Sequence, residues 1–288
     1  MTVIKEATFS KERALYHLQD ACIKNCRFEG EEDGESAMKE SANLRVEDCY
    51  FDLRYPFWHV KNAVITQSVM TENCRAALWY DKNVTVVNCT MNGIKALREC
   101  KNVTIIDTAA DSPEFCWKCR NVRVSGGSIQ SEYAFLLSRN ITASGLNFKG
   151  KYSFQYVINA GFVKCTFDTK DAFWHTKNVT VKDSVIKGEY LGWYSENLTL
   201  IRCKIIGTQP LCYCKGLKLI DCETENCDLS FEYSKVKATI NGEIVSVKNP
   251  ESGKIVADKI GEIILKDSVR KNRAKILTRP ATEKAERK

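Results

Sequence analysis

An asparagine that recurs at a fixed interval constrains the fold of this 288-residue chain more than any other feature. The same position is continued by Gly216 and Lys235, and of the ten intervals nine are 19 residues and one is 21. The asparagines are Asn43, Asn62, Asn83, Asn102, Asn121, Asn140, Asn159, Asn178 and Asn197. A repeat of this length indicates a solenoid, in which each repeat packs against its neighbours in sequence.

The pattern inside each repeat indicates β-strands. Counting the asparagine as position 0, positions 1 and 3 are apolar, as in Val84/Val86 and Val179/Val181. This alternation is typical of a half-buried strand. Position 6 is small, position 8 is mostly apolar, and positions 12 to 17 form an aromatic-rich segment long enough for a third strand. Three short strands and three corners fit into 19 residues, whereas a helix does not.

Two other solenoids are excluded by the spacing. A leucine-rich repeat needs about 20 to 29 residues and a second leucine segment, and a hexapeptide helix repeats in sixes. The pattern instead resembles the right-handed parallel β-helix of the pectin-lyase-like superfamily over about residues 20–240. Residues 12–16 (ERALY), 34–37 (GESA), 54–59 (RYPFWH) and 207–213 (GTQPLCY) resemble an uncharacterised bacterial family of single-domain β-helix proteins. That resemblance implies the fold and carries no known activity.

We therefore predict an all-β protein, a single-stranded right-handed parallel β-helix of about 11 rungs over residues 20–240. Residues 1–19 depart from the repeat, and Ser10 before a short run predicts an N-terminal helical cap. After residue 240 the phase is lost, so residues 241–268 predict an irregular C-terminal β cap. Residues 269–288 hold eight Lys/Arg against two Glu, which predicts a basic, disordered tail.

Composition restricts the partners. The formal net charge is +7, and because the tail carries most of it, nucleic-acid binding is expected only through residues 269–288. The first ten residues have no apolar signal-peptide core, so we read the 14 cysteines as reduced thiols of a cytoplasmic protein. No apolar run is long enough for a membrane span, and no membrane partner is expected. The oligomeric state is not predicted.

The candidate functional surface is the third-strand segment. Position 11 is often charged, and positions 14 to 16 hold aromatic residues in many repeats, among them Trp58/His59 and Trp174/His175. Strand alternation prevents positions 15 and 16 from both facing inward, so either the tryptophan column or the histidine/tyrosine column lies outside. The predicted ligand-binding residues are Arg54, His59, Arg75, Trp79, Tyr80, Arg98, Glu132, Trp174, His175, Glu189, Trp193 and Tyr194. The alternative interpretation is a column of stacked rings and ion pairs that serves stability only.

Catalysis on the same surface is the second hypothesis. The candidate acid–base residues are Glu132, Glu189, His59 and His175, in an enzyme of the polysaccharide lyase or glycoside hydrolase type. No metal site or cofactor is predicted, because positions three apart in a strand, as in Cys116 and Cys119, point to opposite faces. The first hypothesis is a non-catalytic binding or scaffold protein with a carbohydrate or another small polar ligand.

Overall fold

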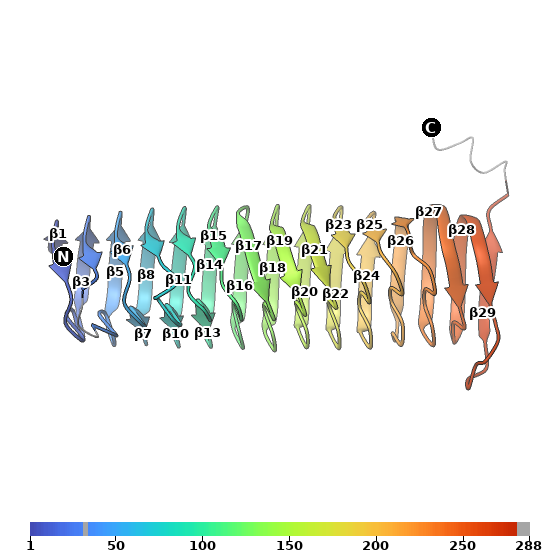
Figure 1. Ribbon diagram of the computed structural model, residues 1–288, viewed down its shortest axis with the longest axis horizontal. Coiled ribbons are helices and arrows are strands. Elements are labelled where there is room, and N and C mark those ends of the chain that lie inside the picture. Colours follow the sequence, from blue (N-terminus) through green and yellow to red (C-terminus); the bar gives the residue numbers. More distant parts are fainter. Residues whose placement is uncertain (31–33, 281–288) are drawn as a thin grey trace. The chain divides into compact units, whose positions relative to one another are not determined.

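The computed structural model describes residues 1–30 and 34–280, and every regular element within these ranges is a β-strand (Figure 1). The chain forms a parallel β-solenoid of about 14 turns with a repeat of about 19 residues, which confirms the predicted all-β parallel architecture. It divides into two compact units, Met1–Gly150 and Lys151–Lys288. None of the described residues forms a helix long and apolar enough to cross a bilayer.

Each turn of the first unit opens with one strand and continues with a second, shorter one. The opening strands are β1 (Thr2–Lys5), β3 (Gln19–Lys24), β5 (Ala42–Glu47), β8 (Lys61–Thr66), β11 (Lys82–Val87), β14 (Lys101–Ile106), β16 (Arg120–Ser125) and β18 (Arg139–Ser144). The second strands are β2 (Thr8–Phe9), β4 (Arg27–Phe28), β6 (Tyr50–Phe51), β9 (Val69–Met70), β12 (Thr90–Met91), β15 (Ala109–Asp111), β17 (Ser128–Glu132) and β19 (Asn147–Lys151).

The second unit repeats this arrangement and ends in longer strands. Its opening strands are β20 (Ile158–Val163), β22 (Lys177–Lys182) and β24 (Glu196–Ile201), and its second strands are β21 (Thr166–Lys170), β23 (Val185–Lys187) and β25 (Lys204–Ile206). The last four strands are β26 (Leu217–Glu225), β27 (Lys235–Lys248), β28 (Ser252–Ile264) and β29 (Arg273–Thr278).

The repeat sets the strand register directly. Val84 of β11 lies opposite Val103 of β14, which lies opposite Val122 of β16, and all three are buried. The asparagine at the start of each strand adopts positive φ, as in Asn83 at 58°, a geometry that asparagine tolerates better than most residues. Within each unit the asparagine amides also donate hydrogen bonds to the asparagine of the preceding turn, for example Asn102 Nδ2 to Asn83 Oδ1 at 2.8 Å and Asn197 Nδ2 to Asn178 Oδ1 at 3.0 Å.

The predicted N-terminal helical cap is wrong. Thr2 of β1 pairs with Ala21 of β3, so the 19-residue spacing already holds at the second residue of the chain. The backbone amide of Leu15 donates to Ala37 O of the next turn at 2.8 Å and not to a carbonyl four residues earlier. A turn of this length gains too few internal hydrogen bonds to nucleate a helix.

The prediction of about 11 rungs is also too low, because the coil continues beyond residue 240. Strands β26, β27, β28 and β29 pair in parallel order, with Lys235 opposite Ser252 and Ser252 opposite Arg273. The turns with these spacings of 17 and 21 residues lack the asparagine that marks the other turns. Strand β29 lies within the segment predicted to be a disordered tail, where Ala274 and Ile276 are half-buried. Residues 281–288 of that segment lie outside the described residues.

The third strand forms a regular sheet in the first unit only. The three strands β7 (Phe57–Trp58), β10 (Leu78–Trp79) and β13 (Leu97–Arg98) pair in parallel. In the last two turns of the first unit and in the second unit the corresponding segment is a turn, because every second residue has a left-handed backbone conformation, as Asp171, Phe173 and His175 show. This segment positions the aromatic surface in both units.

Candidate functional site

Strands β7 and β10 place two tryptophans side by side on the outer surface of the first unit. Phe57 and Leu78 point inward and are fully buried, whereas the paired Trp58 and Trp79 are half-buried. Their ring centroids lie 5.0 Å apart with an interplanar angle of 9°. Tyr55 packs against both rings, with centroid distances of 6.0 Å to Trp58 and 5.6 Å to Trp79.

A cation closes each end of this tryptophan stack. Lys39 Nζ lies 3.8 Å from the ring centroid of Trp58, and the Arg98 guanidinium lies 5.0 Å from that of Trp79. The position that holds Trp58 and Trp79 in two turns thus holds Lys39 in the turn before them and Arg98 in the turn after them. We call Lys39, Tyr55, Trp58, Trp79 and Arg98 the tryptophan cluster.

The indole N–H groups of the cluster lack hydrogen-bond acceptors. Trp58 Nε1 and Trp79 Nε1 are both buried without a partner among the residues that the structure describes. Two turns after Trp79, Trp117 Nε1 donates to Tyr133 O at 2.8 Å, so an acceptor is available elsewhere in the same unit. A buried donor without an acceptor costs about 1–3 kcal/mol. The cluster therefore holds two unmet donors beside two cations.

Both aromatic columns are partly exposed, which differs from the expectation that only one lies outside. His59 and Tyr80, which follow Trp58 and Trp79, have φ of 60° and 59°. A residue with a left-handed backbone conformation breaks the alternation of side chains along an extended strand, so two consecutive side chains both project outward. His59 and Tyr80 stack with centroids 5.1 Å apart.

The remaining predicted residues of the first unit surround the cluster or lie apart from it. Arg54 is 3.4 Å from Glu35 in an ion pair, and Arg98 also pairs with Glu99 at 3.2 Å. Arg75 is exposed just before β10. Glu132 ends β17, and its carbonyl accepts from the amide of Glu114 at 2.7 Å. The structure thus brings Arg54, His59, Trp79, Tyr80 and Arg98 together, and Glu132 lies on a later turn.

The second unit carries a related surface whose indole N–H groups are satisfied. Trp174 and Trp193 stack at 5.4 Å and 5°. Trp174 Nε1 donates to Tyr190 O at 2.6 Å, and Trp193 Nε1 donates to Gln209 O at 2.8 Å. His175 lies between Tyr156 and Tyr194, at 4.9 Å and 5.0 Å, and Tyr194 stacks on Tyr213 at 4.8 Å. Since each ring covers its neighbour, this column presents ring edges to solvent.

The predicted acid–base residues are not paired as a catalytic dyad requires. Neither the His59 nor the His175 imidazole makes a hydrogen bond or ion pair with any residue that the structure describes. Glu189 is held by Lys170 at 2.7 Å, and this hydrogen bond raises the pKa of Lys170. The neighbouring Asp171 is buried, and burial raises its pKa. Over residues 1–30 and 34–280, no group of three potential metal ligands is found.

One buried carboxyl group in the first unit was missed by the sequence interpretation. Asp81 directly follows Tyr80 and is fully buried. Its Oδ1 accepts a hydrogen bond from the Val60 amide at 2.7 Å, whereas Oδ2 has no partner. Burial, together with the nearby Cys100, raises the pKa of Asp81 well above its usual range. The sequence feature that could have revealed Asp81 is an acidic residue at a position of the repeat that holds Ser138 and Ser195 in other turns.

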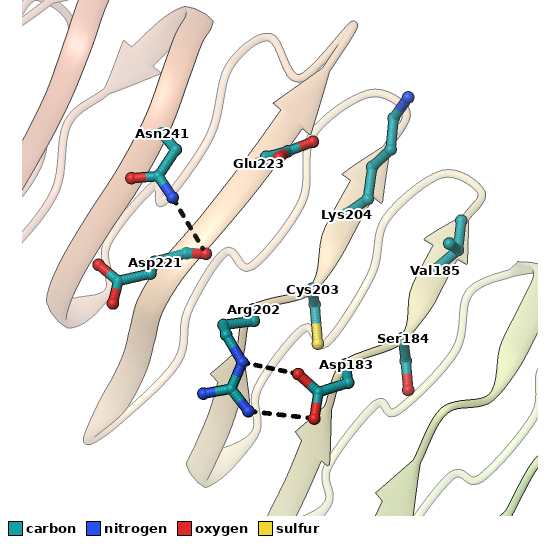
Figure 2. Close-up of a pocket in the computed structure, with 9 residues that line it drawn as sticks. All are labelled: Asp183, Ser184, Val185, Arg202, Cys203, Lys204, Asp221, Glu223 and Asn241. Carbon is teal, nitrogen blue, oxygen red and sulfur yellow. Dashed lines mark hydrogen bonds and ion pairs between the residues drawn. The ribbon is translucent and has the colours of Figure 1, made fainter. Parts of the chain in front are cut away.

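A polar recess lies on a different face of the second unit (Figure 2). It has a volume of about 440 Å³ and lies between β23, β25 and the strands that follow. Asp183 accepts two hydrogen bonds from Arg202, at 2.7 and 3.0 Å, which lowers the pKa of Asp183 (Figure 2). Because the charges of this pair cancel, neither Asp183 nor Arg202 is left as an unpaired charge in the recess.

The fold and this surface define a parallel β-solenoid protein with an aromatic and cationic outer face. The chain belongs to the family described as "Protein of unknown function (DUF3737)", which matches residues 2–277. No curated protein matches its sequence.

Solved structures with similar folds are distant in sequence. PfbA, a surface adhesin of Streptococcus pneumoniae, is 11% identical with a TM-score of 0.37, over 73% of this chain and 72% of that chain. HetL, a pentapeptide repeat protein of a Nostoc cyanobacterium, is 12% identical with a TM-score of 0.25, over 78% and 92%. The A-module of the Azotobacter vinelandii mannuronan C-5 epimerase AlgE4 is 8% identical with a TM-score of 0.27, over 95% and 85%. At these scores the likeness carries no argument about function.

Proposed function

We propose that the protein is a non-catalytic binding protein that holds a sugar unit at the tryptophan cluster. The observation that carries this proposal is the pair of buried, unpartnered indole N–H groups of Trp58 and Trp79 between two cations. Both groups are buried in the unbound protein, so a ligand supplies acceptors to them only when the Lys39 side chain over Trp58 moves, and it then recovers the free energy that they cost.

The end of the stack at Trp58 is the place where a ring face can be uncovered. One face of Trp58 packs on Trp79, and the other is covered by the Lys39 ammonium. Lys39 makes no ion pair with a described residue, so its long side chain is free to move. A sugar ring then stacks on the indole, and Lys39 contacts its oxygens or a carboxylate. The other predicted residues, Arg54, His59, Arg75 and Tyr80, form the rim of this proposed site.

Glycan-array binding followed by a turnover assay on the bound glycans tests the proposal. We expect binding without turnover, and a loss of at least tenfold in affinity in Trp58→Ala, as for a buried aromatic contact at the centre of a site. Trp174→Ala in the second unit is the matched control and is expected to retain binding. Equal binding by Trp58→Ala and the unmodified protein overturns the proposal.

A carbohydrate-active enzyme is the second candidate. Asp171 favours it, because burial raises its pKa and so shifts this carboxyl group, beside Glu189 and Lys170, toward the protonated form that a general acid needs. This candidate predicts cleavage of a bound glycan that is lost in Asp171→Asn and in Glu189→Gln. Glu132→Gln tests the corresponding residue of the first unit.

We further propose that the coil is right-handed, as in the pectin-lyase-like superfamily, because parallel strands of one sheet are almost always joined by right-handed connections. We also propose a cytoplasmic location. It is supported by the 14 cysteines, of which 13 are buried as free thiols that fill the core.

A further inference from the structure

A column of five like charges follows the first unit at one position of the repeat. The first residues of β8, β11, β14, β16 and β18 lie opposite one another in unbroken register. These residues are Lys61, Lys82, Lys101, Arg120 and Arg139, and all five are exposed. At about 4.8 Å per turn the column is about 19 Å long. We call it the cation column.

No acidic side chain neutralises the cation column. None of its five residues makes a hydrogen bond or an ion pair through its side chain with any part of the chain that the structure describes. The asparagine position beside it and the next outward position hold no Asp or Glu in these five turns. Glu99, on its other side, is already paired with Arg98 at 3.2 Å.

The same position of the second unit alternates in charge. Lys177 of β22 lies opposite Glu196 of β24, at 3.1 Å between Nζ and Oε2, and Lys215 approaches the other oxygen of Glu196 at 4.0 Å. Like charges directly opposite each other in a sheet are destabilising, and opposite charges are stabilising. The fold therefore does not require cations at this position. In the first unit, negative charge placed beside the column would be stabilising.

The shape of the column limits what fits it. Its cations follow the strand register one per turn, and only beside Arg120 do the exposed Lys118 and Arg123 widen it. An anionic membrane presents charge in two dimensions and is usually bound with inserted apolar side chains. The phosphates of a nucleic-acid duplex follow a helical path away from a straight line. Single-stranded nucleic acid gains affinity from open aromatic faces, but the nearest rings, His59 and Tyr80, already stack on each other at 5.1 Å.

A linear acidic polysaccharide fits both the charge and the neighbouring amides. In an extended chain a pyranose unit is about as long as one turn of the solenoid is high, so one carboxylate per sugar matches one cation per turn. Asn83, Asn102 and Asn121 beside the column each use one N–H and one oxygen lone pair on the neighbouring asparagines. Their second N–H and lone pair remain for sugar hydroxyls.

We propose that the cation column binds a linear acidic polysaccharide, one anionic sugar per turn, along β8, β11, β14, β16 and β18. This inference concerns a surface outside the tryptophan cluster and does not rest on the function proposed for that cluster. Trp58→Ala is expected to leave binding to the column unchanged, so failure of one proposal is distinguishable from failure of the other.

The test measures binding of an oligogalacturonate about six units long, enough to span the five turns, and of its methyl ester as the uncharged control. In Lys82→Ala/Lys101→Ala we expect affinity to fall about fivefold for each charge removed. The slope of log affinity against log salt should become shallower by about one for each charge. Lys177→Ala/Lys215→Ala in the second unit is the matched control, and it should keep the affinity and slope of the unmodified protein.

Three results overturn the proposal. The first is unchanged affinity in Lys82→Ala/Lys101→Ala, with thermal unfolding showing that the variant is folded. The second is equal binding of the methyl ester. The third is tighter binding of single-stranded DNA or of phosphatidylserine vesicles that the same double variant abolishes, which assigns the column to a different class of partner.

Discussion

The two units place different chemistry at the same positions of the repeat. In the first unit the stacked Trp58 and Trp79 lie between Lys39 and Arg98 and have unpartnered N–H groups. In the second unit Trp174 and Trp193 stack in the same way, but both N–H groups donate to backbone carbonyls. The cation column of the first unit likewise corresponds to the paired Lys177 and Glu196 of the second.

The two units also differ at the buried position two residues before the asparagine. Asp81 has one carboxyl oxygen without a partner, whereas Ser195 in the second unit donates to Cys214 Sγ at 3.2 Å. At these positions, the second unit therefore shows what this solenoid needs for stability alone. Where the first unit departs from it, the departures are unmet donors, unpaired cations and a buried acid, all of which cost stability. Such costs concentrate at functional sites.

The largest effect expected from this comparison is on Asp81. Its raised pKa means that the folded protein keeps a proton that the unfolded chain releases above about pH 4. Because the unfolded state then binds fewer protons, the free energy of unfolding falls as pH rises. Asp81→Ser removes the buried acid and should raise the free energy of unfolding at pH 7 by about 1–2 kcal/mol. Urea unfolding at pH 4.5 and pH 7 measures it.

Ser138 is the matched control for Asp81. Its hydroxyl accepts from the Cys119 amide at 3.0 Å and donates to Cys116 O at 2.7 Å, so both of its interactions are satisfied. Ser138→Ala should lower the free energy of unfolding by about 1 kcal/mol equally at both pH values. If Asp81→Ser also changes the free energy of unfolding equally at both pH values, Asp81 is ionised in the folded protein. The contrast between the units then fails at this position.

The next effect concerns the indole N–H groups. Trp79→Phe and Trp193→Phe each replace one indole of a stacked pair by a smaller phenyl ring. Only Trp193→Phe also leaves a carbonyl, Gln209 O, without its donor. We expect Trp193→Phe to lower the free energy of unfolding by about 1 kcal/mol more than Trp79→Phe does. Urea unfolding of both variants measures the difference. Equal losses would mean that Trp79 Nε1 has a partner in solution.

The sequence predicts the fold wherever the repeat keeps its asparagine. The 19-residue spacing places Val84, Val103 and Val122 in register, as observed. The spacing fails at the C-terminal end because β27 and β28 pair through long strands at 17-residue spacing without asparagine. At the N-terminus β1 keeps the spacing, but it opens with Thr2–Lys5 and has no asparagine to mark it.

The aromatic surface is predicted only in part, because strand alternation was assumed where left-handed residues occur. The repeat alone cannot tell that His59 has positive φ, so it leaves open which column faces outward. Whether an indole N–H finds an acceptor depends on local geometry and leaves no mark in the sequence. The cation column is different, because a Lys or Arg before each of five consecutive asparagines is visible once the repeat is aligned.

The smallest effect expected is a change of stability when the charge patterns of the two units are exchanged. Lys101→Glu places an acid between Lys82 and Arg120, which recreates the alternation of Lys177, Glu196 and Lys215. Replacing like-charge contacts by opposite-charge contacts should raise the melting temperature by about 1–2 °C at low salt. The reverse change, Glu196→Lys, should lower it by a similar amount.

Salt dependence distinguishes this electrostatic explanation from a change in packing. Exposed charges are screened within about 3 Å at 1 M salt, so both shifts should disappear there. A melting temperature for Lys101→Glu that is unchanged at low salt would show that the five cations do not repel one another. The cation column would then give up no stability in the unbound protein, and the strongest physical reason to regard it as a binding surface would be lost.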